Sequence, residues 1–231
     1  MAVSRATALR IRNFLDNWLP PAIRDSRWLM YPLLRLALGP TWAEYARFKP
    51  VGFSLSTEEF ADTYRRVAGS EAQGATDLNE ACVEAILASI PGGTVLEAGC
   101  GRGYLAQRLT EVADKVTDCD IVLGDALPTH DRIAYEEASV EALPYPDNSF
   151  DTVVCTHTLE HVQRIGAALS ELRRVARQRI VVVVPQERPY KFSFNLHLHF
   201  FPHPWSWQAV AGAVPGATLR DLGDWFYVEP Q

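Results

Sequence analysis

The chain has 231 residues, of which 48% are hydrophobic and 22% charged, enough apolar material for one medium-sized domain with an added segment. A formal net charge of −6 argues against a surface that binds nucleic acid by neutralising its phosphates. We therefore expect no nucleic-acid partner.

The four cysteines are predicted to be buried, reduced thiols. Each lies in or beside an apolar run, and none belongs to a CxxC pair or to a Cys/His spacing that binds metal; they are Cys82, Cys100, Cys119 and Cys155. The first residues do not lead into a continuous apolar stretch, so we expect no signal peptide. Together these features favour a cytoplasmic location.

Residues 1–75 are expected to form a helical segment that precedes a main domain at residues 76–231. Prolines punctuate this segment, and Ser56 and Glu59 have the spacing of a capping box. Helices are predicted at residues 4–18, 26–38 and 56–67, with a loop at 49–52 and a hinge at 68–75. The segment can serve as a lid or as a dimerisation arm, so a homodimer stays open.

The stretch from Trp28 to Trp42 is the one candidate for membrane contact. It is too short to cross a bilayer and is interrupted by Pro32, Arg35 and Pro40. We therefore predict no transmembrane segment and leave contact with a membrane surface as an alternative to lid or dimer arm.

From residue 76 onward, short apolar runs alternate with stretches of helical periodicity. Helices are predicted at residues 77–90, 102–112, 162–176 and 204–211, and strands at 94–98, 116–120, 132–138, 152–156, 180–184, 217–222 and 225–228. Gly223 and Asp224 join the last two strands and permit an antiparallel hairpin. The alternation predicts an α/β fold with a doubly wound, mainly parallel seven-stranded sheet.

A glycine-rich loop connects the first of these strands to a helix. Gly99, Gly101 and Gly103 lie between them in a G-x-G-x-G pattern, where glycine lets the backbone approach a ligand and helix-start amides attract an anion. A dinucleotide-binding loop needs its third glycine where Tyr104 stands. The spacing therefore disfavours a hydride-transfer enzyme.

Two carboxylates accompany this loop. Asp120 ends the second strand, where an acidic side chain can accept hydrogen bonds from both hydroxyls of a ribose. Glu97 ends the first strand and adds negative charge suited to a cationic ligand. The alternative is that both side chains only cap adjacent helices.

Three segments resemble successive motifs of class I S-adenosylmethionine (SAM)-dependent methyltransferases, in particular the small-molecule group. They read VLEAGCGRGYLAQRL, VTDCDIV and ASVEALPYPDNSFDTVVCTHTLEHV, and the resemblance extends over residues 77–231. It implies a Rossmann-like methyltransferase fold and SAM as the cofactor.

The resemblance also implies a set of cofactor-binding residues. The methionine end of SAM is expected at Glu97, Gly99, Cys100, Gly101, Gly103 and Tyr104, the ribose at Asp120 and Ile121, the adenine at Ser139 and Val140, and the sulfonium beside Thr156. The chain departs from the family at two places. Ser139 stands where many members carry an Asp, and residues 177–179, Arg-Gln-Arg, replace a glycine turn before the fifth strand.

Histidines following the fourth strand are candidates for a general base. His157 and His161 follow the strand that, by resemblance, reaches the transferring methyl group, and histidine titrates near neutral pH. We predict His161 as the base, with His157 and Glu160 as further catalytic residues. The alternative for His161 is a helix-start residue with a local hydrogen bond.

Further polar and aromatic residues are predicted to contact the acceptor. His197 and His199 share a face if their segment is extended, and Trp28 and Tyr31 come from the N-terminal segment. No Cys or nearby acidic residue completes a metal site around these histidines, so we predict none. No motif in the sequence indicates that the protein requires Mg²⁺, and we leave this requirement open.

These features favour an O-methyltransferase acting on a small-molecule or oligosaccharide acceptor, with a hydroxyl of a sugar, glycan or similar metabolite as the target. A quinone, lipid or amine methyltransferase is the alternative within the class. Outside enzymology, the alternative is a SAM-binding module without turnover.

Overall fold

The computed structural model describes residues 18–68 and 76–231, which divide into two compact units. Of the described residues, 18–68 and 188–198 form the first unit, and 76–187 and 199–231 form the second. Residues 188–198, which the sequence analysis placed in the main domain, thus group with the N-terminal helices. The helix predicted at residues 4–18 and the hinge at 68–75 lie almost wholly outside the described residues.

The described part of the first unit is helical. It contains α2 (Pro21–Arg24), α3 (Arg27–Leu38), η1 (Gly39–Thr41), α4 (Trp42–Val51), η2 (Gly52–Ser54) and α5 (Thr57–Ala68). The predicted capping box is confirmed, because the Glu59 carboxylate accepts the Ser56 N–H at 2.9 Å and the Ser56 hydroxyl accepts the Glu59 N–H at 3.3 Å. The loop predicted at residues 49–52 is wrong, since α4 continues through Pro50. A proline in a last turn removes only one backbone donor.

Residues 188–198 are bound to the helices of the first unit by polar contacts. The Arg24 guanidinium, 2% exposed, donates to the Phe192 carbonyl at 2.7 Å and lies 4.5 Å from the centre of the Tyr190 ring. Lys49 Nζ donates to the Tyr190 carbonyl at 2.8 Å. A buried arginine that satisfies a distant carbonyl explains why this segment belongs to the N-terminal unit.

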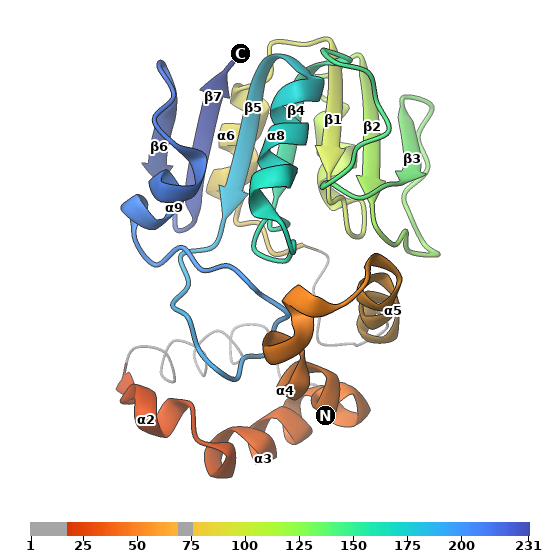
Figure 1. Cartoon of the computed structure of the whole chain (residues 1–231). Coiled ribbons are helices and arrows are strands. Elements are labelled where there is room, and N and C mark those ends of the chain that lie inside the picture. Colours follow the sequence, from red (N-terminus) through yellow and green to blue (C-terminus); the bar gives the residue numbers. More distant parts are fainter. Residues whose placement is uncertain (1–17, 69–75) are drawn as a thin grey trace. The chain divides into compact units, whose positions relative to one another are not determined.

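The second unit is built on a seven-stranded sheet with the order β3-β2-β1-β4-β5-β7-β6, which Figure 1 shows from one face. Its strands are β1 (Thr94–Ala98), β2 (Lys115–Asp120), β3 (Ile133–Glu137), β4 (Phe150–Thr156), β5 (Ala176–Val184), β6 (Thr218–Asp221) and β7 (Trp225–Pro230). Strands β1 to β5 are parallel, while β7 is antiparallel to both β5 and β6. The predicted mainly parallel sheet and its final hairpin are confirmed.

Four helices cover the sheet of the second unit. They are α6 (Glu80–Ala88), α7 (Tyr104–Leu109), α8 (Ile165–Val175) and α9 (Pro204–Ala211). Leu172 and Trp207, on α8 and α9, pack with Leu96 in one buried cluster, and Ile86 and Leu109, on α6 and α7, pack in a second cluster. The sheet is therefore covered on both faces.

Several local predictions need correction. Helix α6 begins at Glu80 and not at residue 77, because the Asn79 side chain accepts the Cys82 N–H at 2.9 Å and caps the helix there. Helix α7 begins only at Tyr104, since Gly103 before it has a φ of +69°. Residues 177–179 are not a connection but part of β5, which begins directly after α8.

All four cysteines are free and buried, as predicted. Within residues 18–68 and 76–231, no helix combines the length and apolar character that crossing a bilayer requires.

Candidate active site

The predicted cofactor residues lie at or after the carboxyl ends of four neighbouring strands, β3, β2, β1 and β4. In a parallel sheet these ends lie at one edge, and between β1 and β4 the order of the strands reverses in sequence. Such a switch point is where open α/β sheets bind ligands. The glycine loop after β1, Asp120 at the end of β2 and Thr156 at the end of β4 are therefore brought together.

The glycine loop adopts a backbone that requires glycine. Gly99, Gly101 and Gly103 have φ values of +88°, +53° and +69°, which disfavour residues with a side chain. A Cβ on Gly99 would overlap the Thr158 hydroxyl and lie 2.5 Å from its methyl group, whereas a Cβ on Gly101 would meet nothing within 4 Å. The loop is thus packed tightly against residues after β4 and open around Gly101.

Asp120 holds this loop in place from the neighbouring strand. Its Oδ2 accepts the Gly101 N–H at 2.9 Å, and its Oδ1 accepts the Val122 N–H at 3.3 Å. Burial raises the pKa of the Asp120 carboxyl, although these backbone hydrogen bonds oppose the shift. Each carboxylate oxygen keeps a further acceptor site, so the side chain can still bind ligand hydroxyls.

A second carboxylate on β2, which the sequence analysis missed, lies beside Glu97. Glu97 on β1 and Asp118 on β2 are paired in register, and they are 2% and 0% exposed. The strand alternation of VTDCD could have indicated this, because Asp118 lies two residues before Asp120 and therefore shares its face. The site thus contains a third acidic group.

His157, at the end of β4, lies between two carboxylates. Its Nδ1 is 3.4 Å from Glu160 Oε1 and its Nε2 is 3.5 Å from Asp224 Oδ2. Burial alone lowers the pKa of the imidazole, but the hydrogen bonds and charges of Asp224 and Glu160 outweigh it and raise the pKa to about 10. His157 is therefore a cation at neutral pH.

Asp224 is itself held by Asn79, whose side-chain amide donates to its Oδ2 at 3.0 Å. Asn79 also caps α6, and Asp224 lies in the turn between β6 and β7. His157 has a φ of +46°, a conformation uncommon for a residue with a side chain. The ion pairs thus tie the end of β4 to the hairpin. Neither Asp224 nor Asn79 was predicted as a site residue from the sequence.

His161 lies in the turn between β4 and α8 and is partly buried. Its backbone N–H donates to the Thr158 carbonyl at 2.9 Å, so the local hydrogen bond considered for it exists at the backbone. The structure places His161 on the same chain segment as His157 and Thr158, next to the carboxyl end of β4.

The residues predicted to contact the acceptor are divided between the two units. His199 belongs to the second, where its Nε2 lies 2.9 Å from the Val162 carbonyl and burial lowers the pKa of its ring. His197 belongs to the first, as do Trp28, which is 93% exposed, and Tyr31, which packs edge-on against Phe192. The chain bends at Leu198, between the two histidines.

The segment predicted to flank adenine is a tight turn. The Ser139 hydroxyl accepts the Glu141 N–H at 3.2 Å, and Val140 is 8% exposed. Glu141 in turn accepts the N–H groups of Gln163 at 2.7 Å and Arg164 at 3.0 Å. The turn is therefore anchored to the residues that lead into α8.

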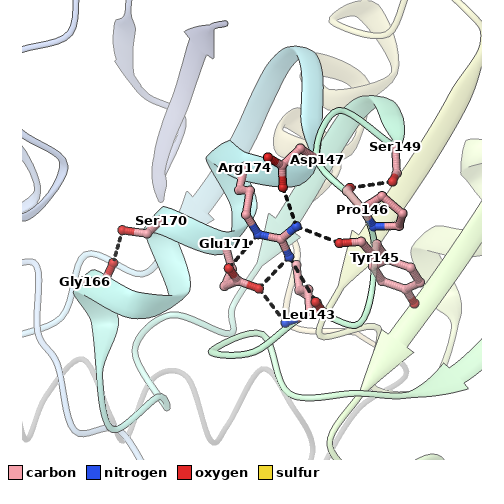
Figure 2. A network of polar contacts seen from close by, with 9 residues as sticks. All are labelled: Leu143, Tyr145, Pro146, Asp147, Ser149, Gly166, Ser170, Glu171 and Arg174. Carbon is pink, nitrogen blue, oxygen red and sulfur yellow. Dashed lines mark hydrogen bonds and ion pairs between the residues drawn. The ribbon is translucent and has the colours of Figure 1, made fainter.

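Arg174 on α8 holds the loop that follows this turn, as Figure 2 shows. Its guanidinium donates to the carbonyls of Tyr145 at 2.7 Å and Leu143 at 3.0 Å, and pairs with Asp147 at 2.8 Å. Glu171 orients the arginine at 2.8 Å and accepts the Leu143 N–H at 2.8 Å. This network positions the connection between the turn and β4.

Residues 96–184, which span β1 to β5 and include the glycine loop and Asp120, match the family described as a methyltransferase domain. The chain carries a class I SAM-dependent methyltransferase domain. SAM is the cofactor of this family.

Relatives of the methyltransferase domain were found among known proteins. A malonyl-[acyl-carrier protein] O-methyltransferase of Erwinia billingiae is 30% identical over 53% of this chain and 51% of its own. A probable SAM-dependent methyltransferase of Mycolicibacterium smegmatis is 36% identical over 44% of this chain and 41% of its own. A solved SAM-dependent methyltransferase from Aquifex aeolicus is 16% identical, with a TM-score of 0.47, covering 77% of this chain and 98% of that one. The chain spans about half the length or less of these two sequence relatives.

The residues of the methyltransferase domain fit SAM. The loop is open at Gly101, Asp120 retains acceptor sites for hydroxyls, and Glu97 Oε2 has no hydrogen-bond partner among the described residues. A ligand with ribose hydroxyls and positive charge satisfies all of these groups.

Proposed function

We propose that this protein transfers the methyl group of SAM to an oxygen atom of a small-molecule or carrier-bound acceptor. The observation that carries the proposal is the cofactor site, in which Asp120 closes the glycine loop through the Gly101 N–H at 2.9 Å. The oxygen acceptor is supported by the similarity to malonyl-[acyl-carrier protein] O-methyltransferases, at 30% and 31% identity.

When bound, SAM supplies an electrophilic methyl group. The acceptor oxygen attacks the methyl carbon in line with the carbon–sulfur bond, and S-adenosylhomocysteine leaves. The loop amides and Asp120 orient the cofactor, and Thr156 borders the position of the transfer. Alignment of this kind accounts for much of the acceleration of a two-substrate displacement. The acceptor loses a proton only if it is a hydroxyl, because a carboxylate is already ionised at neutral pH.

We propose His161 as the base for a hydroxyl acceptor, such as a hydroxyl of a sugar or a similar metabolite. His157 is unsuited to that role, since an imidazolium held between Glu160 and Asp224 has no free lone pair. It acts instead as a positioning residue. The assignments of His197, His199, Trp28 and Tyr31 to acceptor binding remain part of the proposal.

The first test is titration calorimetry with S-adenosylhomocysteine (SAH). We expect the wild type to bind and Asp120→Ala to lose about 3 kcal/mol of binding free energy, roughly a hundredfold, because charge-assisted hydrogen bonds to the ribose disappear. Asp131→Ala, which removes an acidic side chain that is 89% exposed, is the matched control and should bind as the wild type does. An unbound wild type would refute the cofactor site.

The acceptor is then sought by transfer of labelled methyl from SAM to carboxylates, sugars, other hydroxylated metabolites and amines. With a hydroxyl acceptor, His161→Gln should lower kcat by about a hundredfold or more, the usual contribution of general base catalysis, and leave SAH affinity unchanged. An unchanged kcat would remove His161 as the base. Transfer to amines alone would refute the oxygen acceptor.

A further inference from the structure

A row of side chains crosses three neighbouring strands beneath the glycine loop. Glu97 on β1 is paired in register with Asp118 on β2, and Asp118 is paired with Tyr135 on β3. Residues paired in parallel register point to the same face of the sheet. Glu97 and Asp118 are therefore neighbours, and both are almost completely buried.

Three of the four carboxylate oxygens of this pair, Glu97 Oε2 and both oxygens of Asp118, lack hydrogen-bond partners among the described residues. Two buried carboxylates side by side are costly, because each is desolvated and each repels the other. If one of them keeps its proton, it becomes a donor to the other and both penalties fall.

Among the described residues, no cation contributes to the pKa shifts of Glu97 and Asp118. Burial, the charge of Asp118 and the charge of Asp120 all raise the pKa of Glu97, and burial raises the pKa of Asp118 to about 7. Their charges in turn raise the pKa values of neighbouring groups, namely Cys100 in the loop, Cys119 on β2 and Tyr135 on β3, while Glu97 also acts on Cys155 on β4. Every group of the described part that contributes to these shifts of Glu97 and Asp118 is acidic.

We propose that Glu97 and Asp118 share one proton in the cofactor-free domain and release it to solvent when SAM binds, so that Asp118 makes the site discriminate SAM from SAH. This inference rests on the proposed function. It concerns a carboxyl pair of this chain and needs no contact between the cofactor and Asp118.

The discrimination follows from charge. SAM carries a sulfonium that SAH lacks, so SAM brings one more positive charge to the site, near a carboxyl pair that is itself buried. A nearby positive charge favours ionisation of a carboxyl group, and the effect is larger in a low dielectric than in water. Once the methyl group has left, the doubly ionised pair is no longer compensated, and reprotonation favours release of the product.

The test is calorimetric titration of SAM and of SAH in phosphate and in Tris, two buffers that differ widely in heat of protonation. The difference in apparent binding enthalpy between the buffers gives the number of protons released. For SAM we expect up to one proton released per molecule bound, with the release falling as the pH rises through the range in which the free pair titrates. For SAH we expect less than half of that release.

Asp118→Asn is the informative variant, because it keeps the shape of the side chain and removes the titrating pair. It should bind SAM with no net proton release. Asp131→Asn removes an acidic group from an exposed side chain and should behave as the wild type does. Circular dichroism and unfolding curves establish that each variant is folded.

If Asp118→Asn does not fold, the wild type by itself still tests the shared proton. Its ratio of SAM affinity to SAH affinity should rise with pH between 6 and 8, by at most about tenfold per pH unit for a single proton. A ratio independent of pH, or equal proton release with both ligands, would overturn the shared proton. In that case intact SAH binding would leave the proposed function standing, whereas failure of SAH to bind would refute the function itself.

Discussion

Replacement of Gly99 by alanine should destabilise the second unit more than any other change in the glycine loop. The residue has a φ of +88°, and a Cβ placed there would lie 2.5 Å from Thr158 Cγ2 and 2.7 Å from Thr158 Cβ. A side chain forced into such a backbone conformation costs about 1–3 kcal/mol. Overpacking against a neighbour adds about 1–3 kcal/mol. The sum, about 2–6 kcal/mol, is a large part of the usual stability of a domain.

The two contributions can be separated with variants of the same loop. Gly101 also has a positive φ, +53°, but a Cβ there meets nothing within 4 Å, so Gly101→Ala should cost only the conformational part. In Gly99→Ala, the further change Thr158→Ala removes the hydroxyl and methyl group that the new Cβ would meet and leaves only the contact of 2.7 Å with Thr158 Cβ. The double variant should therefore recover part of the overpacking cost of about 1–3 kcal/mol relative to Gly99→Ala.

The measurement is urea unfolding followed by circular dichroism, with the free energy of unfolding extrapolated to water. Slopes that agree among the variants show that the same structure unfolds in each. If Gly99→Ala costs no more than Gly101→Ala, or if Thr158→Ala restores nothing, the tight packing of the loop against the residues after β4 is refuted.

Two further predictions concern ion pairs of the second unit. Because the pKa of His157 is raised from 6.5 to about 10 in the folded protein, its stabilising effect is fully present below pH 6.5 and is lost as pH rises to about 10. The difference in free energy of unfolding between the wild type and His157→Gln, measured by urea unfolding at several pH values, should shrink over that range; a constant difference would contradict the imidazolium. Arg173 binds Glu229, which is 2% exposed, through two hydrogen bonds of 2.8 Å, so Arg173→Met should cost about 3 kcal/mol by leaving a buried carboxylate unpaired. Arg108→Met, which breaks only exposed pairs, should leave the free energy of unfolding nearly unchanged, and equal losses in the two variants would argue against burial as the cause.

Local patterns of sequence predicted much of the second unit. Strand β1 and helix α9 have the predicted bounds, because an apolar run between glycines and a proline at a helix start are signals contained in neighbouring residues. The glycine loop and Asp120 were recognised for the same reason, since a strand, a turn and a helix follow one another without interruption. Where a local signal was ambiguous, the observed bounds of an element differ from the predicted ones. Helix α4, for example, continues through Pro50, where a loop was predicted.

Pairings between distant segments were beyond these patterns. Asp118 was overlooked because its neighbour Glu97 lies on another strand, and the register of β1 with β2 arises only when the sheet forms. The ion pair of His157 with Asp224, on the β6–β7 turn, was not predicted, because nothing in the nearby sequence places Asp224 against the imidazole ring.

The sequence by itself determined the α/β architecture and the glycine loop, because these depend on the periodicity and conformational freedom of consecutive residues. Its resemblance to a known family implied the kind of cofactor. Only the tertiary structure decided the charge states of the site. Ionisation depends on burial and on charges within a few ångströms, and both are set by strands and turns that are far apart in the chain.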